Sequence, residues 1–506
     1  MRNSKFKIIF LFFFLGLLVY VPVLFNGFVW DDEVLFQKAG AIPTDIYFRP
    51  VMSVIYSTIY NLFGLQPFFF HFFQLIFHIL TAVLIYYLFK HFFKETVSLI
   101  LAIIFLVHPA LVEAISFTSS MQEVLFVLMG ITGLYLFVDH DDFSIKQVFL
   151  STPLLLISLL IKETAVVFFL LVFCYLLLFK KNNQVVLINY SIFAVILLMA
   201  YFLFRLTGGS LYVQGQGLFP IMRVSLATRL INIPMIIFYY LKKFFCPMNL
   251  AIAQHWVINS ISFKNFFLPI IFEILLFITA IIYVIKKKNK MFTFFFLWFL
   301  IGLLPHLQII PLNMTVAERW LYFPMIGLLG MIGSIIEISN IKNQKSKILL
   351  SFLIVIIVLF SVRSFVRTLD WRNGLSLFGR DIRQNSSFDL QNNMGVELFR
   401  IGRYSEAKKY FEISTQMAPY WWVNWNNLGA AYEREKNIQK AMEYYQKSVN
   451  NGQYYLAYEN LAKTLVLYGK DQKKTEEFLQ KALKLFPEDQ NLLIINKYFQ
   501  EKNSQK

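Results

Sequence analysis

The chain has 506 residues, of which 58% are hydrophobic and 18% aromatic, and its mean hydropathy is +0.58. Soluble domains rarely have this composition, whereas polytopic membrane proteins do. The formal net charge of +17 does not indicate nucleic acid as a partner, because many lysines stand in short loops between apolar runs, where they orient a protein in the membrane. Cys174 and Cys246 lie in apolar surroundings without metal-type spacing, which argues against a disulfide framework.

Eleven apolar stretches are candidates for membrane-spanning helices, which need about 20 residues each. The first follows Arg2, Lys5 and Lys7 and is not followed by a small-residue cleavage site, so it predicts a retained signal anchor. The expected spans lie near residues 8–25, 69–89, 97–112, 121–138, 147–161, 164–179, 186–204, 266–285, 292–310, 320–338 and 348–365.

The distribution of lysines predicts the orientation of these spans. With the N-terminus inside, four of the five inside loops are basic, and the exception is the acidic stretch Asp139–Asp142. Within 205–265, the apolar residues 225–245 are interrupted by Lys242 and Lys243, which favours an interfacial or re-entrant helix. An odd number of spans then places the C-terminal domain outside. That side is the periplasm for a bacterial inner membrane, or the lumen for the ER membrane of a eukaryote.

From about residue 388 the chain becomes polar and repetitive. Gly395 and Gly429 are 34 residues apart, as are Ala407 and Ala441, and aromatic residues recur at the same period. A period near 34 with this pattern resembles the tetratricopeptide repeat. We expect an all-α chain with a membrane helical bundle at residues 1–367, a linker at 368–387 and a repeat α-solenoid at 388–506. The three repeats are expected at 388–421, 422–454 and 455–488, followed by an end cap.

Asp31 and Asp32 stand just after the first span, within Phe28-Val29-Trp30-Asp31-Asp32-Glu33. They can simply be a polar cap at the end of that span. Alternatively, two neighbouring carboxylates repel each other, so one keeps a raised pKa and suits a general base for an incoming hydroxyl. The acids could also hold a divalent cation through oxygen ligands, although the sequence does not establish a metal.

Further ionisable residues punctuate the apolar runs on the same predicted side. Arg49 stands on the loop that carries the aspartates, and Glu113 follows His108-Pro109 at the next outside turn. His71 and His78 are seven residues apart on one helix face, either as packed core histidines or as ligands in a cavity.

Two charged motifs lie further along the chain. Lys162-Glu163 interrupts a long apolar run, either as a self-neutralising pair or with Lys162 as a point charge for phosphate. Glu318 and Arg319 precede another span, with Tyr322 one turn further on. Arg319 is the better phosphate candidate, because a guanidinium can hold phosphate oxygens in a bidentate manner. An interfacial anchor is the alternative for this motif. No P-loop, GxSxG, HExxH or CxxC motif competes with these residues.

This ordered set of motifs resembles the GT-C-type membrane glycosyltransferases, in particular the transmembrane-and-tetratricopeptide O-mannosyltransferase-like proteins. The resemblance implies a polyprenyl-phosphate sugar as donor substrate. It implies that Asp31 and Asp32 act at the acceptor, and that Arg319 and Lys162 hold the donor phosphate. The stretch Ala114–Ser120, where a basic residue is expected, contains none.

We therefore expect a glycosyltransferase that moves a sugar, with inversion, from this donor to a hydroxyl of a protein or glycan acceptor on the outer side. Glu113, Glu163, Glu318, Arg49, His71 and Tyr322 would complete the substrate site. The repeats would bind the acceptor or a protein partner, since stacked helix pairs form a concave face. The alternatives are a scaffold that uses the repeats for assembly, and a transporter or flippase for a lipid-linked sugar. The sugar, the lipid length and the acceptor are not specified by the sequence.

Overall fold

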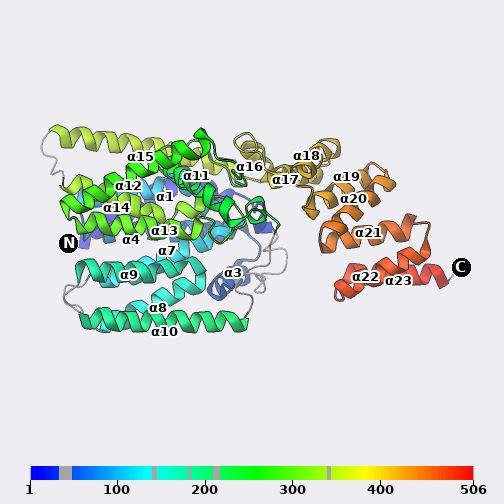
Figure 1. Ribbon diagram of the computed structural model, residues 1–506, viewed down its shortest axis with the longest axis horizontal. Helices are drawn as coiled ribbons and strands as arrows, with labels where there is room; N and C mark the ends of the chain where they lie inside the picture. Colours follow the sequence, from blue (N-terminus) through cyan, green and yellow to red (C-terminus); the bar gives the residue numbers. More distant parts are fainter. Residues whose placement is uncertain are drawn as a thin grey trace. The chain divides into compact units, whose positions relative to one another are not determined.

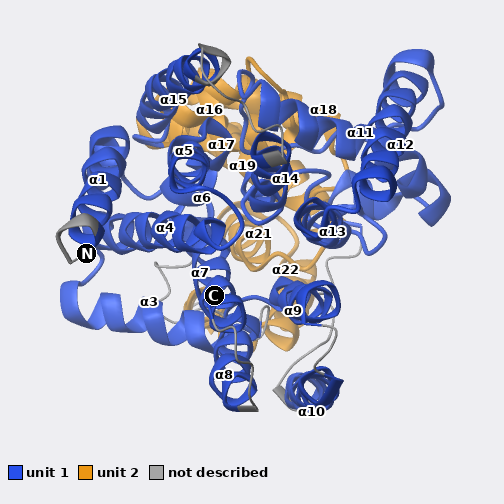
Figure 2. Cartoon of the chain, turned by 90° about the vertical axis from the view of Figure 1, so that its left-hand side faces the viewer, with its two compact units in different colours: residues 1–373 blue, residues 374–506 orange. Residues whose placement is uncertain are grey.

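A computed structural model of the chain describes residues 2–33, 48–139, 145–180, 184–208, 217–338 and 344–504. It divides into two compact units, Met1–Asn373 and Gly374–Lys506 (Figure 2). Within the described residues the regular elements are helices, joined by a single antiparallel β-bridge between Gln254 and Val316. The all-α prediction is confirmed.

The first unit is a bundle of long apolar helices connected by short turns. Its elements are α1 Arg2–Tyr20, η1 Val21–Phe25, α3 Pro50–Phe63, α4 Pro67–Lys90, α5 Glu95–Val107, η2 Pro109–Leu111, α6 Val112–Ser116, η3 Thr118–Ser120, α7 Met121–Val138, α8 Ile145–Ile161, η4 Glu163–Ala165, α9 Val166–Phe179, α10 Gln184–Gly208, η5 Pro220–Arg223, α11 Leu226–Phe245, η6 Phe263–Phe267, α12 Leu268–Lys287, α13 Lys290–Leu303, η7 Leu304–His306, η8 Glu318–Leu321, α14 Pro324–Ile338 and α15 Gln344–Asp370.

The eleven expected spans each overlap an apolar helix of this unit. By length and composition six helices can cross a membrane, and the bent pair Glu95–Val107 and Pro109–Ser116 makes a seventh. Four shorter apolar helices occupy the remaining expected positions: Lys146–Ile161, Glu163–Phe179, Lys290–His306 and Pro324–Glu337. The chain is therefore an integral multi-pass membrane protein.

Successive long helices of the first unit run side by side and alternate in direction (Figure 1). One end of the bundle carries the start of α5 and the end of α14, where Lys94 donates its backbone N–H to Glu337 at 3.0 Å. The opposite end carries the ends of α1 and α5 and the start of α14. Asp31, Glu113 and Arg319 all belong to that opposite end. The predicted grouping of charges on one side is thus a property of the fold. Within the predicted inside loops, residues 140–144, 181–183 and 339–343 lie outside the described residues.

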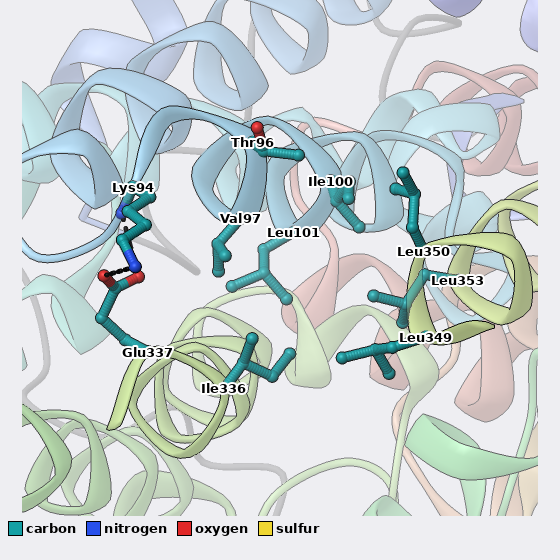
Figure 3. Close-up of a pocket in the computed structure, with 10 residues that line it drawn as sticks. All are labelled: Lys94, Thr96, Val97, Ile100, Leu101, Ile336, Glu337, Leu349, Leu350 and Leu353. Carbon is teal, nitrogen blue, oxygen red and sulfur yellow. Dashed lines mark hydrogen bonds and ion pairs between the residues drawn. The ribbon is translucent and has the colours of Figure 1, made fainter. Parts of the chain in front are cut away.

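An apolar pocket lies between α5, α14 and α15, at the end of the bundle that carries Lys94, called the lysine-bearing end (Figure 3). Val97, Ile100 and Leu353 are among the side chains that line it, and the ion pair of Lys94 with Glu337, 3.6 Å apart, borders it. This pocket is remote from the charged motifs, so it is no part of the candidate site.

The segment expected to hold an interfacial or re-entrant helix contains α11. This helix does not qualify as a span by length and composition, since it carries Arg229, Lys242 and Lys243. Residues 209–216 of the same segment lie outside the described residues. Lys243 is buried and its Nζ lies 3.8 Å from a carboxylate oxygen of Glu318, so the end of α11 is fixed to η8.

The second unit consists of a short first helix, three helix pairs and a last helix. The pairs are α17 Phe388–Arg400 with α18 Tyr404–Met417, α19 Trp422–Arg434 with α20 Ile438–Asn451, and α21 Tyr455–Tyr468 with α22 Gln472–Leu485; α23 Gln490–Ser504 ends the array. These pairs correspond to the predicted repeats and end cap. The segment 368–387 was expected to be a linker, and the boundary between the two units falls within it. It contains the end of α15 and all of α16, Gly374–Asp381, which packs on α17.

Small residues bring the two helices of a repeat together, as their 34-residue period predicts. A Cβ on Gly395 would lie 2.5 Å from the ring of Phe411, and a Cβ on Gly429 would lie 2.7 Å from the ring of Tyr445. Such distances are far inside van der Waals contact, so only glycine admits these rings. Leu398, Phe411, Leu428 and Tyr445 therefore form part of one continuous buried core in this unit.

Candidate active site

The site is built on residues 112–120, which interrupt the apolar helix that begins at α5. Pro109 cannot continue that helix because it lacks a backbone N–H and disfavours helical geometry in the preceding residue. His108 is accordingly extended, and its side chain accepts a hydrogen bond from the N–H of Ala110 at 3.2 Å. The chain bends by 50° and passes through α6 and η3 before α7 begins. This break leaves backbone groups of residues 112–120 available for side chains from other helices.

Three buried side chains fix the course of the 112–120 segment. Gln74 on α4 donates to the carbonyls of Ala114 and Phe117 at 2.6 and 2.8 Å. Tyr56 on α3 donates to the carbonyl of Thr118 at 2.7 Å. His71 on α4 also lies behind the segment, with its Nδ1 3.5 Å from the hydroxyl of Thr118. His71 thus supports the site from inside the bundle and is buried there.

The two adjacent aspartates occupy opposite environments. Asp32 is fully buried, and its carboxylate accepts from the N–H and hydroxyl of Ser119, both at 2.6 Å. The N–H groups of Thr118 and Val29 donate to its other oxygen at 3.3 and 3.4 Å. Asp31, one residue earlier, is exposed. Asp32 therefore anchors the loop, while Asp31 is the carboxylate that an incoming molecule can reach.

The backbone just before the aspartates is strained. Trp30 has φ 52°, a left-handed conformation that a bulky side chain rarely adopts. Its ring stacks on Phe117 with centroids 6.2 Å apart. Such strain persists only where the surroundings fix it, and it clusters at functional sites. The stacked rings and the Asp32 hydrogen bonds supply that fixation and direct Asp31 outward.

Burial raises the pKa of Asp32 to about 7, and the hydrogen bonds from Ser119, Val29 and Thr118 oppose that rise. The expected elevation is therefore present, but its cause is removal from water and not repulsion from Asp31. It also falls on the aspartate that is closed off from solvent. A raised pKa and an accessible base were expected at one residue, and the structure separates them.

Arg319 joins the same site from the other half of the unit. Its guanidinium forms a buried ion pair with Glu113, and its backbone N–H donates to the other Glu113 oxygen at 3.1 Å. The guanidinium also lies over the rings of Phe117 and Trp320, 5.8 Å from each centroid. Its Nη2 faces the Sδ of Met314 at 3.8 Å, a weak acceptor. Asp31 is close enough to add to the electrostatic attraction on Arg319.

The charged pair Lys162-Glu163 does not neutralise itself. Lys162 is buried and forms an ion pair with Glu123 of α7, and its Nζ lies over the ring of Phe126 at 5.5 Å. Glu163 accepts a bidentate pair of hydrogen bonds from Arg49, at 2.8 and 3.2 Å. Glu123 was not predicted as a site residue. A lone acid at the start of an apolar helix was the signal that could have found it, because such a charge needs a partner.

Two of the expected substrate residues face the interior. Tyr322 is fully buried, and its hydroxyl lies 2.8 Å from Nδ1 of His78, whose Nε2 reaches the carbonyl of Leu106 at 2.9 Å. Glu318 accepts from the N–H of Ala251 at 2.8 Å and pairs with Lys243. Both side chains therefore hold η8 in place, so that Arg319 is positioned between them. In the described part of the chain no cluster of three or more His, Cys, Asp or Glu could hold a metal ion.

Comparisons with known proteins agree with this architecture. Residues 49–206 match the family model for dolichyl-phosphate-mannose-protein mannosyltransferase, and residues 424–450 match the tetratricopeptide repeat. In these two segments the chain is similar to membrane mannosyltransferases and to tetratricopeptide-repeat proteins.

The relatives are similar over a limited stretch. The human protein O-mannosyl-transferase TMTC3 is 27% identical over 136 residues, which is 27% of this chain and 15% of that protein. Tmtc3 of Drosophila melanogaster, another protein O-mannosyl-transferase, is 26% identical over 152 residues, 29% of this chain and 16% of that protein. No solved structure matches the chain.

We predict that removing one member of the Arg319–Glu113 pair is far more damaging than removing both charges. Arg319→Met should lower the free energy of unfolding by about 3–5 kcal/mol, because Glu113 is left buried and unpaired. Arg319→Met/Glu113→Gln should recover most of that loss. Thermal unfolding in detergent measures both variants. Arg403→Met, which breaks an exposed pair with Glu406, should leave the Tm unchanged. Equal Tm values for the single and double variants would contradict a buried, coupled pair.

We also predict a pH-dependent contribution of Asp32 to stability. Because its folded pKa lies above the unfolded value, the folded state binds the extra proton. Its contribution is complete below the unfolded pKa, near 4, and is lost as the pH rises through about 7. The Tm of the wild type relative to Asp32→Asn should therefore fall by a few degrees between pH 5.5 and 8. A constant or rising difference would mean that Asp32 is ionised throughout.

Proposed function

We propose that the chain is a membrane glycosyltransferase that moves a mannosyl-type sugar from a polyprenyl-phosphate donor to a hydroxyl of an acceptor. The single observation that carries this proposal is the proximity of an exposed carboxylate, Asp31, to a rigidly held guanidinium, Arg319, at one end of the bundle. The family match and the similarity to protein O-mannosyl-transferases support the same reaction class.

Asp31 is the general base in this proposal. Its carboxylate accepts the proton of the acceptor hydroxyl while the hydroxyl oxygen attacks the anomeric carbon of the sugar. The bond from that carbon to the phosphate oxygen breaks on the opposite face, so the configuration inverts. Asp32 keeps the Asp31 carboxylate in place through its bonds to Thr118 and Ser119, and such fixed geometry is what proximity catalysis requires.

Arg319 stabilises the negative charge that develops on the leaving phosphate. Among the described residues its Nη2 meets only the sulfur of Met314, a weak acceptor, so its N–H groups can turn to phosphate oxygens. Glu113 keeps the guanidinium plane fixed from the other edge. Arg49 and Lys162 add positive charge at the same end, although each is already paired with a glutamate. The sugar-bearing side is then the outer or lumenal face, because Lys90 and Lys94 of an expected inside loop lie at the other end of the bundle.

We predict that Asp31→Asn lowers the transfer rate by about 10²–10⁴-fold, the usual worth of a general base, without lowering the Tm. Asp31→Glu should retain a fraction of the activity because it keeps a carboxylate. The assay uses the full chain in detergent with radiolabelled polyprenyl-phosphate mannose, glucose and N-acetylglucosamine, and with hydroxyl-bearing peptides and glycans as acceptors.

Wild-type rates in Asp31→Asn would remove Asp31 from the mechanism. Absence of transfer from every donor by properly folded protein would remove the transferase function itself, and would favour a scaffold or a lipid-linked sugar transporter.

A further inference from the structure

The apolar cavity at the lysine-bearing end takes no part in the proposed mechanism. It has a volume of about 240 Å³ between α5, α14 and α15. Its walls are aliphatic side chains of all three helices, among them Val97, Ile100, Leu101, Ile336, Leu350 and Leu353. Figure 3 shows the leucines of α15 facing the side chains of α5 and α14, with Lys94 and Glu337 at one edge of the cavity. An apolar cavity of about 150 Å³ already binds benzene, so this one accommodates a segment of a hydrocarbon chain.

The cavity borders a helix whose two ends contact the bundle differently. Near the end of α15, Ser364 donates to the carbonyl of Val107 at 2.7 Å, and the side chain of Asn26 donates to the carbonyl of Thr368 at 3.1 Å. Near its start, the leucines of α15 line the cavity. Little of α15 is buried by protein, and the cavity is open to its surroundings, which for an apolar span are lipid tails. An empty cavity forfeits dispersion contacts, so a lipid chain inside it would stabilise the packing of α15.

The edge of the cavity is polar and carries a lysine with spare donors. Glu337 accepts the backbone N–H of Lys94 at 3.0 Å, whereas the Nζ of Lys94 stands 3.6 Å from the carboxylate. The side chain of Lys94 is 68% exposed, and such an exposed ion pair contributes little to stability. The ammonium group has three N–H donors, so it can turn to the oxygen of a ligand while Glu337 keeps its backbone hydrogen bond. Thr96 brings a hydroxyl to the same edge.

Further lysines stand near this edge. Lys347 is exposed and lies three residues before Leu350 on α15, so it shares the face of α15 that borders the cavity. Lys90 lies one turn before Lys94 and pairs with Glu95 at 3.4 Å. Lysines of this kind mark the inside of a membrane. The inner leaflet carries anionic lipids, and basic pockets between helices on that side bind their head groups.

We propose that the cavity binds one acyl chain of an anionic phospholipid of the inner leaflet, with the phosphodiester of that lipid at Lys94. The aliphatic walls suit the chain, and the lysines at the edge suit the charge of the head group. The bound lipid fills the gap between α15 and α5 and so fixes the helix that leads into the second unit. This site is independent of the proposed transferase function.

Lipid binding to the full chain in detergent tests this assignment. The probes are palmitoyl-oleoyl phosphatidylglycerol and palmitoyl-oleoyl phosphatidylcholine, and native mass spectrometry measures the Kd of each. Phosphatidylglycerol should bind about tenfold more tightly, because only its head group carries a net negative charge. Val97→Trp fills the cavity and should weaken phosphatidylglycerol binding by about tenfold. Lys94→Gln should abolish the preference for phosphatidylglycerol over phosphatidylcholine.

Matched variants elsewhere separate the site from general effects of tryptophan and charge. Val355→Trp changes an exposed position of α15 outside the cavity, and Lys264→Gln removes an exposed lysine just before α12; both should bind like the wild type. Leu350→Trp fills the cavity from its exposed side, and it replaces Val97→Trp if that variant has a lowered Tm without lipid.

Three results would overturn the assignment. The first is equal affinity of the wild type for the two phospholipids. The second is undiminished phosphatidylglycerol binding in a folded cavity-filling variant. The third is tighter binding of polyprenyl phosphate that the cavity-filling variant alone loses, since the cavity would then belong to the sugar carrier.

Discussion

The site depends on the hydrogen bonds that the buried carboxylate of Asp32 accepts. It connects the loop after α1 to backbone amides of Thr118 and Ser119, residues more than eighty positions away in the chain. Those amides are available because the helix beginning at α5 breaks at Pro109. The cost of burying Asp32 is offset by four donated hydrogen bonds, and the result is a rigid frame from which Asp31 projects.

The same end of the bundle also holds ion pairs between elements far apart in sequence. Glu113 meets Arg319, Glu123 meets Lys162, and Glu163 meets Arg49. A lone charge in an apolar bundle is expensive, so each cation selects a carboxylate and the pairs fix how the helices assemble. Arg319 gains most from this arrangement, because Glu113 orients one edge of its guanidinium and leaves another edge for a ligand. The positions of these side chains are thus set by the free-energy cost of burying a charge without a partner.

Much of the architecture could be predicted from local sequence. Apolar runs fixed the approximate spans, the 34-residue period fixed the repeats, and the order of the charged motifs placed Asp31, Asp32, Glu113 and Arg319 at one end. The pairing of charges could not be predicted, because Lys162 stands beside Glu163 in the chain but meets Glu123 in space. The different roles of Asp31 and Asp32 could not be predicted either, because the burial of Asp32 depends on its contacts with residues 112–120. The helix α16 was missed because its short polar sequence reads as a linker.

The proposed mechanism places Asp31 and Arg319 on opposite sides of the anomeric carbon of the bound sugar. A structure of the full chain with bound polyprenyl-phosphate mannose tests it most directly. The account predicts the phosphate within hydrogen-bonding distance of the Arg319 guanidinium, with the anomeric carbon between that phosphate and the side of the site where Asp31 projects. A phosphate bound away from Arg319, for example at the lysine-bearing end beside Lys94, would contradict the account.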